Sequence, residues 1–364
     1  MYNNPVEVFE TNNWEDKCKS IQENLGLNKP LVITSKGSLK RHNLSLLFEP
    51  DSIFSDIKPD PTFSSCQSAI DFIDISKFNG VIAIGGGSVM DTAKTTMACL
   101  GTGISELSEL LTITKPFNNI IPSIFVPTTH GTGSEVTMWG TIWNMDEKKK
   151  YSISHPDLYP TVAILDANLT LSLPFDISLN TSMDALSHSF EAIWNINRNN
   201  TSTSLAIDAI SLIIGNIEDL KVNPNNLAIR KNLLIAANKA GLAFSNTKTA
   251  AAHSISYPLT MHYGVAHGIA ASISLPWLLE INRNAIEEEL KIIFSRLNIN
   301  SFIELKDLLI KLVLQDGSNR LKNFGIKKED LNWLVNQSYT KGRMENNIVE
   351  LTNSDIREIL EKIF

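Results

Sequence analysis

Residues 81–87 read Val-Ile-Ala-Ile-Gly-Gly-Gly, and this short stretch decides the fold class that we expect for the chain. Four consecutive apolar residues without polar alternation are typical of a strand buried on both faces of a parallel sheet. The glycines permit a tight turn, and residues 88–94 then suit a helix. A buried strand, a glycine turn and a helix in this order indicate an α/β domain.

The neighbouring segments continue this alternation of strands and helices. Residues 31–34 predict a second buried strand, and residues 120–126 predict a third one ahead of a proline. Apolar spacing predicts a helix over residues 67–78, while residues 46–48 and 52–54 are weaker strand candidates. The first half of the chain is therefore expected to form a doubly wound α/β domain.

The pattern changes after residue 173, because almost every later segment favours helix. The expected helices cover residues 181–192, 205–214, 228–243, 305–314 and 356–364. We therefore expect two domains, an α/β domain over residues 1–173 and an all-helical domain over residues 174–364.

Composition restricts the classes of function. The 364 residues carry a net charge of −7 and no long basic run, which argues against a nucleic-acid partner. The three cysteines form no paired motif, and neither a signal peptide nor an apolar run of membrane-spanning length is visible. The sequence predicts a cytoplasmic protein without a membrane partner.

The glycine turn is the first candidate binding site. Glycines without a Cβ atom let backbone N–H groups approach a phosphate, and the start of a helix attracts an anion. The sequence is neither GxGxxG nor GxxxxGK[ST], so a plain turn is the alternative, but the carboxyl end of a central strand favours a ligand. Residues 127–135, rich in threonine and glycine, are a second candidate, with a simple helix cap as the alternative.

Four side chains form a candidate metal site. Asp184 and His188 are four residues apart and share one face of the expected helix, while His253 and His267 lie among small apolar residues. One carboxylate with three imidazoles suits Fe²⁺ or Zn²⁺ better than Mg²⁺ or Ca²⁺. The alternatives are a capping pair on the helix and satisfied core histidines.

These motifs, in this order, resemble the iron-dependent (group III) alcohol dehydrogenase family. The resemblance rests on GGGS at residues 85–88 with Asp91 and Lys94, on PTT and GTGSE within residues 127–135, and on the Asp184 and histidine motifs. It implies an N-terminal dinucleotide-binding domain, a C-terminal all-helical domain and a homodimer. It also implies that Asp184, His188, His253 and His267 bind a divalent metal, Fe²⁺ first and Zn²⁺ as the alternative.

The same resemblance implies a set of cofactor contacts. Pyrophosphate would meet the glycine turn, and the nicotinamide ribose would meet the threonine loop and a lysine; the residues are Gly86, Gly87, Ser88, Asp91, Thr128, Thr129, Thr137 and Lys150. Many family members hold the adenosine 2′-hydroxyl with an aspartate where this chain has Ser35, followed by Lys36. A serine with nearby cations accepts a 2′-phosphate, so NADPH is favoured over NADH.

Further departures from the family pattern concern the substrate. Lys248 and Thr249 precede His253 closely, and we expect them to hold an anionic head group, with a solvent-exposed lysine as the alternative. This segment is most similar to the phosphonoacetaldehyde reductase branch. Tyr257 stands where family members often have a second histidine, so Tyr257 and His262 are the expected proton relay.

The expected reaction is reversible hydride transfer between NAD(P)H and a small aldehyde, for example phosphonoacetaldehyde and its alcohol 2-hydroxyethylphosphonate. The alternatives are a dehydrogenase of neutral short-chain alcohols, a dehydroquinate synthase-like lyase and a non-catalytic binding protein on the same fold.

Overall fold

The computed structural model describes residues 2–144 and 147–364. They form two compact units, each described here by itself. The α/β unit comprises residues 4–173 and 225–234, and the helical unit comprises residues 2–3, 174–224 and 235–364. Two short segments, 2–3 and 225–234, thus group with the unit on the other side of residue 173.

The α/β unit contains a six-stranded sheet in the order β1-β8-β5-β4-β2-β3, in which every pairing is parallel. The strands are β1 (Glu7–Glu10), β2 (Pro30–Thr34), β3 (Ile53–Phe54), β4 (Gly80–Gly85), β5 (Ser123–Pro127) and β8 (Val162–Leu165). The helices are α1 (Trp14–Asn24), α2 (Lys36–Arg41), α3 (Phe63–Asp71), α4 (Gly87–Thr102) and α5 (Leu107–Leu110). A separate antiparallel hairpin consists of β6 (Trp139–Asn144) and β7 (Lys149–Ser154).

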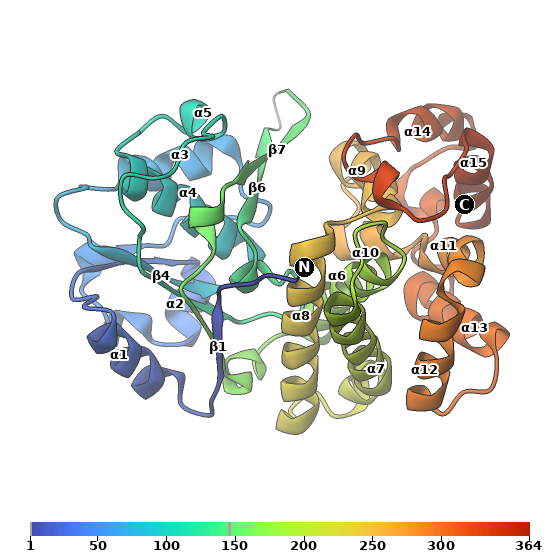
Figure 1. Cartoon of the computed structure of the whole chain (residues 1–364), viewed down its shortest axis with the longest axis horizontal. Coiled ribbons are helices and arrows are strands. Elements are labelled where there is room, and N and C mark those ends of the chain that lie inside the picture. Colours follow the sequence, from blue (N-terminus) through green and yellow to red (C-terminus); the bar gives the residue numbers. More distant parts are fainter. Residues whose placement is uncertain (1, 145–146) are drawn as a thin grey trace. The chain divides into compact units, whose positions relative to one another are not determined.

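Strand β4 is apolar on both faces because helices cover the sheet on both sides (Figure 1). Val81 and Ala83 belong to the core formed with α3, α4 and α5, whereas Ile82 and Ile84 belong to the core formed with α1. All four side chains are fully buried. The doubly wound α/β fold is confirmed, and burial on two faces explains the unbroken apolar run.

The order of the strands creates a switch point between β2 and β4. The chain passes from β2 outward to β3 and then returns to β4 on the other side of β2. Ser35 follows β2 and Gly86 follows β4, so both lie at the carboxyl edge beside this point. Open α/β sheets bind ligands in the crevice at such a position.

The helical unit contains α6 (Phe175–Ile193), α7 (Asn200–Val222), most of α8 (Leu227–Thr247), α9 (Ala251–Tyr263), α10 (His267–Ser272), α11 (Leu275–Asn282), α12 (Glu287–Leu297), α13 (Phe302–Leu314), α14 (Leu331–Gln337) and α15 (Asn353–Lys362). Side chains of Asn199, Ser301 and Thr352 cap α7, α13 and α15 by accepting backbone N–H bonds. The all-helical character expected for this part of the chain is confirmed.

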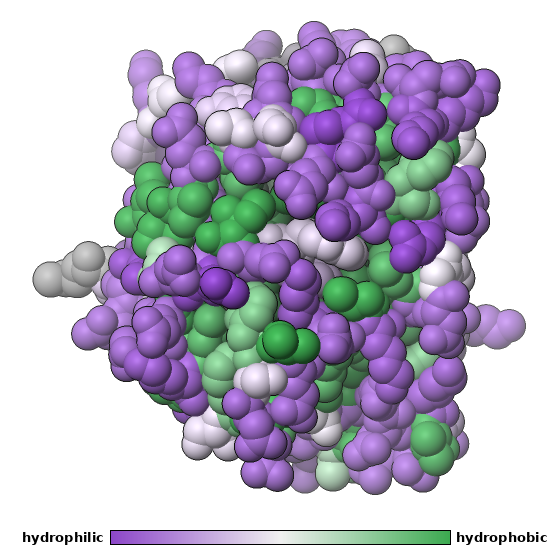
Figure 2. Space-filling model, turned by 90° about the vertical axis from the view of Figure 1, so that its right-hand side faces the viewer, coloured by the Kyte–Doolittle hydropathy of each residue, from purple (hydrophilic) through white to green (hydrophobic). Residues whose placement is uncertain are grey.

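The face that carries α12 to α15 is mostly hydrophilic, with separate apolar groups between the polar ones (Figure 2). Within the described part of the chain, no helix combines the length and the apolar composition that crossing a membrane requires.

Several expected boundaries were wrong. The helix expected over residues 67–78 is α3, which begins earlier because the Thr62 side chain caps it, and it ends at Asp71. Residues 46–48 form no strand, since a 3₁₀ turn occupies Leu44–Leu46. Ile120 and Ile121 precede β5 rather than belonging to it. Lys149 and Lys150 lie in β7, which pairs with β6.

Candidate metal and cofactor sites

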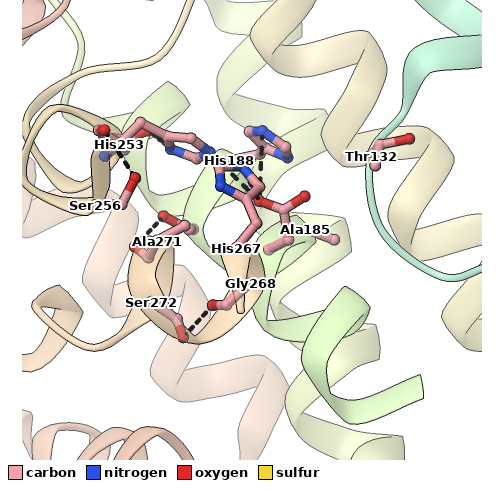
Figure 3. A network of polar contacts seen from close by, with 12 residues as sticks. Thr132, Ala185, His188, His253, Ser256, His267, Gly268, Ala271 and Ser272 are labelled. Carbon is pink, nitrogen blue, oxygen red and sulfur yellow. Dashed lines mark hydrogen bonds and ion pairs between the residues drawn. The ribbon is translucent and has the colours of Figure 1, made fainter. Parts of the chain in front are cut away.

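Three histidines surround one carboxylate in the helical unit. Asp184 and His188 lie one turn apart on α6, His253 lies on α9, and His267 is the first residue of α10. The Nε2 atoms of His188, His253 and His267 lie 3.8, 3.4 and 3.7 Å from Asp184 Oδ1. The three imidazoles converge on one point in Figure 3.

This geometry fits a divalent metal. Four ligands at about 2.1 Å in a tetrahedral arrangement lie about 3.4 Å from one another, close to the separations around Asp184. Asp184 Oδ1 and His253 Nε2 are buried and accept or donate no hydrogen bond within the described residues. A cation between them would satisfy both atoms, because buried polar atoms otherwise find a partner.

Local packing explains how the fold holds these ligands. The His188 ring stacks on Phe244 at 4.0 Å and on His253 at 4.5 Å between centroids. A Cβ atom on Gly268 would lie only 1.9 Å from the Asn180 carbonyl oxygen, so glycine is required where α10 meets α6. Asn180 Oδ1 also accepts the Ile269 N–H at 3.0 Å, which fixes the start of α10 and the position of His267.

Glu191 is a functional candidate that the sequence analysis missed. Its side chain is fully buried, and its carboxylate accepts bonds from the His253 backbone N–H at 3.0 Å and from His253 Nδ1 at 2.5 Å. A proton held on Nδ1 leaves the Nε2 lone pair available to bind a metal beside Asp184. The only signal in the sequence was its place one turn after His188 on the same helix.

Electrostatics at this site also call for a cation. Burial raises the pKa of Asp184, but the charges of His188, His267 and His253 outweigh burial and hold the pKa well below its ordinary value. Burial lowers the pKa of His253, but Glu191 and then Asp184 raise it above its ordinary value. The two buried carboxylates need positive charge nearby, and a divalent metal would supply it in place of protonated imidazoles.

The other residues predicted for catalysis are Tyr257, His262 and Lys248, and they differ in burial and in their position relative to His253. Tyr257 is half-buried one turn after His253 on α9, hence on the same face of the helix. His262 is exposed nine residues after His253, on the opposite face, and its ring packs edge-on against Trp333 at 4.8 Å. Lys248 is exposed directly after α8, with a left-handed backbone at φ 65°. The structure thus brings Tyr257, but not His262, towards the imidazoles.

In the α/β unit, the two candidate loops lie against each other. Gly86 is the N-cap residue of α4, and no side chain accepts a hydrogen bond at this end of the helix. Cβ atoms on Gly86 and Gly87 would lie 3.0 Å from the Thr129 methyl carbon and 2.5 Å from the Thr132 methyl carbon. The glycines therefore let the threonine loop lie against the start of α4, where Ser88 and the buried Thr128 also lie.

A buried network holds this arrangement. Asp91 accepts bonds from Ser134 Oγ at 2.7 Å and from the Thr141 N–H at 2.9 Å. The Lys94 side chain is fully buried. Its Nζ atom donates to Ser134 Oγ at 2.8 Å, to Thr137 Oγ1 at 3.0 Å and to the Trp139 carbonyl at 2.6 Å. Burial lowers the pKa of Lys94 to about 8. Through these bonds Asp91 and Thr137 hold the threonine loop in place against α4.

The remaining cofactor candidates surround the switch point and the hairpin. Ser35 Oγ accepts the Ser38 N–H at 3.1 Å and so caps α2, while Lys36 pairs with Asp56 at 2.6 Å on the surface. An Arg41 guanidinium nitrogen lies 3.2 Å from the point where Gly37 would carry a Cβ atom. On the hairpin, Lys150 Nζ lies 5.2 Å from the centroid of the Trp143 ring.

Comparison with known proteins relates both units to one family. Residues 5–167 match the family model "Iron-containing alcohol dehydrogenase", and residues 178–364 match "Fe-containing alcohol dehydrogenase family, C-terminal". The chain is 31% identical to long-chain-alcohol dehydrogenase 1 of Geobacillus thermodenitrificans, over 86% of this chain and 82% of that protein. It is 28% identical to the sulfoacetaldehyde reductase of Bilophila wadsworthia, over 86% of this chain and 84% of that protein.

The fold has a similar counterpart among solved structures. The sulfoacetaldehyde reductase of Bifidobacterium kashiwanohense, solved in complex with NAD⁺, superposes with a TM-score of 0.91 at 28% identity. The match covers 100% of this chain and 98% of that chain.

Proposed function

Because the chain belongs to the iron-containing alcohol dehydrogenase family, we propose that it interconverts a small anionic aldehyde and the corresponding primary alcohol. Oxidoreductase activity with a nicotinamide cofactor and a metal follows from family membership. Family membership also favours this chemistry over the lyase and the non-catalytic protein considered from the sequence. The proposal concerns the substrate, the residues that act on it and the preferred form of the cofactor.

The observation that carries the proposal is the convergence of three imidazoles on Asp184, with Glu191 behind His253. A divalent metal bound there, Fe²⁺ first and Zn²⁺ as the alternative, would polarise the aldehyde carbonyl, and NAD(P)H would supply the hydride. Asp184, His188, His253 and His267 would hold the metal, while Glu191 orients His253.

The other predicted residues bind the cofactor and move a proton. The open start of α4, with Gly86, Gly87 and Ser88, suits the pyrophosphate, and Thr128, Thr129 and Lys150 suit the nicotinamide ribose. Tyr257 is our first candidate for passing a proton to the alcohol oxygen, because it lies one turn from His253. His262 would contribute only through water, since it faces away from His253.

The preference for NADPH rests on the environment of Ser35. No carboxylate stands directly after β2 to repel a 2′-phosphate. Because Lys36 is paired with Asp56, we assign the neighbouring cation to Arg41, which lies over Gly37 near Ser35. Arginine also presents the paired N–H donors that match a phosphate.

An anionic substrate is supported by two observations. Two relatives of similar length are named sulfoacetaldehyde reductases, and that aldehyde carries a sulfonate. Lys248 is an exposed cation five residues before His253, with Thr249 beside it. Phosphonoacetaldehyde, reduced to 2-hydroxyethylphosphonate, is our proposed substrate. A neutral alcohol is the second candidate, favoured by the similarity to a long-chain-alcohol dehydrogenase.

The test is the loss of reduced-cofactor absorbance by metal-loaded protein. Phosphonoacetaldehyde, sulfoacetaldehyde and butanal are offered with NADPH and with NADH. We expect kcat/KM to be highest for an anionic aldehyde with NADPH, and Lys248→Ala to raise KM for the anionic aldehydes more than for butanal. Oxidation of cofactor with butanal alone would replace the anionic substrate with the neutral one.

A further inference from the structure

Arg343 lies in the loop of residues 338–348, which is hydrogen-bonded to the metal-binding helices of the helical unit. On one side, Ser254 Oγ donates to the Ser338 carbonyl at 2.6 Å and accepts the Thr340 N–H at 2.8 Å. The Asn346 side chain donates to the Thr249 carbonyl at 2.8 Å. These bonds hold both ends of the loop against the start of α9, next to His253.

The same loop is also bound to the end of α6. The Ile196 N–H donates to the Asn346 carbonyl at 2.9 Å, and the Ile348 N–H donates to the Trp194 carbonyl at 2.9 Å. Glu191 lies one turn before Trp194 on α6. The loop therefore joins the two helices that carry Glu191 and His253, and Arg343 lies between its anchored ends.

The Arg343 charge lies within electrostatic reach of Glu191 but forms no close ion pair with it. Glu191 and Tyr257 are the charged or titratable groups that interact with the half-buried guanidinium, and burial lowers its pKa. Within residues 2–144 and 147–364, Arg343 forms no ion pair at 4.0 Å or less. A half-buried guanidinium that pairs with no carboxylate keeps its paired N–H donors available to an anion.

The sum of charges gives the same result. Asp184 and Glu191 contribute two negative charges, which one divalent metal balances. Arg343 then leaves one positive charge in excess near this centre. A neutral alcohol cannot use that charge, whereas a phosphonate, sulfonate or carboxylate can.

We propose that Arg343 binds the anionic head group of the substrate and thereby selects phosphonate- or sulfonate-bearing aldehydes over neutral ones. This inference rests on the proposed function and names the residue that sets its substrate class. The planar guanidinium offers paired N–H donors that match the oxygens of such a head group. Lys248 lies near the same loop, because Asn195 donates to the Lys248 carbonyl at 3.1 Å and forms a β-bridge with Asn347. The Lys248 side chain is exposed, so it attracts the anion without holding it.

The experiment compares Arg343→Gln and Arg343→Lys with a matched control, Lys341→Gln. Lys341 is an exposed cation two residues earlier in the same loop, so its removal changes the net charge equally. Two quantities are measured on each metal-loaded variant: calorimetric binding of ethanesulfonate, an unreactive sulfonate, and the ratio of kcat/KM for sulfoacetaldehyde to that for butanal. Metal content by elemental analysis shows whether the centre is intact.

We expect Arg343→Gln to weaken ethanesulfonate binding and to lower the selectivity ratio by roughly ten- to 150-fold, the worth of a hydrogen bond to a charged group. Arg343→Lys should lose less, because it keeps the charge but not the paired donors. Lys341→Gln should leave both quantities unchanged.

An unchanged selectivity ratio, or unchanged ethanesulfonate binding, in metal-replete Arg343→Gln overturns the inference. Loss of metal in that variant with a constant ratio also overturns it, since Arg343 would then only support Glu191. If the wild-type protein reduces no aldehyde, the proposed function fails, and ethanesulfonate binding alone still decides the role of Arg343.

Discussion

Replacing Glu191 with glutamine tests the electrostatic design of the metal centre. The substitution keeps the size of the side chain and an oxygen that accepts the His253 backbone N–H, but it removes the negative charge 2.5 Å from His253 Nδ1. That charge raises the pKa of His253 and makes the imidazole a stronger ligand. The variant should therefore bind the metal more weakly.

The expected loss is about 10- to 100-fold in metal affinity, or about 1.4–2.7 kcal/mol, the range for residues that orient a metal-binding histidine. Competition with a chromogenic chelator at pH 7 measures the affinity, and circular dichroism shows whether the fold is kept. Glu287→Gln is the control, because Glu287 is exposed on α12 of the same unit. Equal metal affinities for wild type and a folded Glu191→Gln variant would refute the reasoning.

Three further predictions concern packing, backbone strain and pH. Gly268→Ala should lower the free energy of unfolding by at least about 2 kcal/mol and reduce metal content, because its Cβ atom would lie 1.9 Å from the Asn180 carbonyl oxygen; an unshifted thermal midpoint would contradict this. Lys248→Gly should raise the free energy of unfolding by about 1 kcal/mol in urea titrations, because glycine adopts the left-handed backbone without strain. The same variant should bind ethanesulfonate more weakly. A loss of stability would show that the backbone at this position stores no strain. The pKa of Lys94 is about 8 in the folded protein, and its ordinary value is 10.5. Between these two pH values the unfolded chain binds more protons than the folded one, so the free energy of unfolding rises with pH. Lys94 contributes about 3 kcal/mol to that rise. Urea titrations at pH 8 and pH 10 should therefore show a smaller rise for Lys94→Met than for wild type, and equal rises would argue against a depressed pKa.

The sequence was informative where one local pattern has one physical cause. The apolar run at residues 81–84 and its glycines predicted a central strand and the turn after it, because burial on both faces excludes polar residues. Strand β8 and the β6–β7 hairpin were missed, since short strands are defined by their neighbours more than by their own residues. The end of α3 was placed too late because apolar spacing continued beyond its last turn.

The candidate site shows the same division. Asp184 and His188 are visible as a pair because they are four residues apart on one helix, and His253 and His267 were further candidates whose role as ligands the resemblance to a family implied. Glu191 and Arg343 have no such signal. Glu191 acts through His253, which is 62 residues away in the chain, and Arg343 lies in a distant loop that is hydrogen-bonded to the start of α9.

The sequence by itself thus determined the order of the strands and helices in outline, the glycine turn and the histidine motifs, because these depend on residues within one or two helical turns. Only the tertiary structure decided that the glycine and threonine loops lie against each other and that the buried Glu191 carboxylate accepts bonds from His253. The physical reason is that charge and burial act through space, so their effect depends on how distant helices pack and not on the residues beside them in the chain.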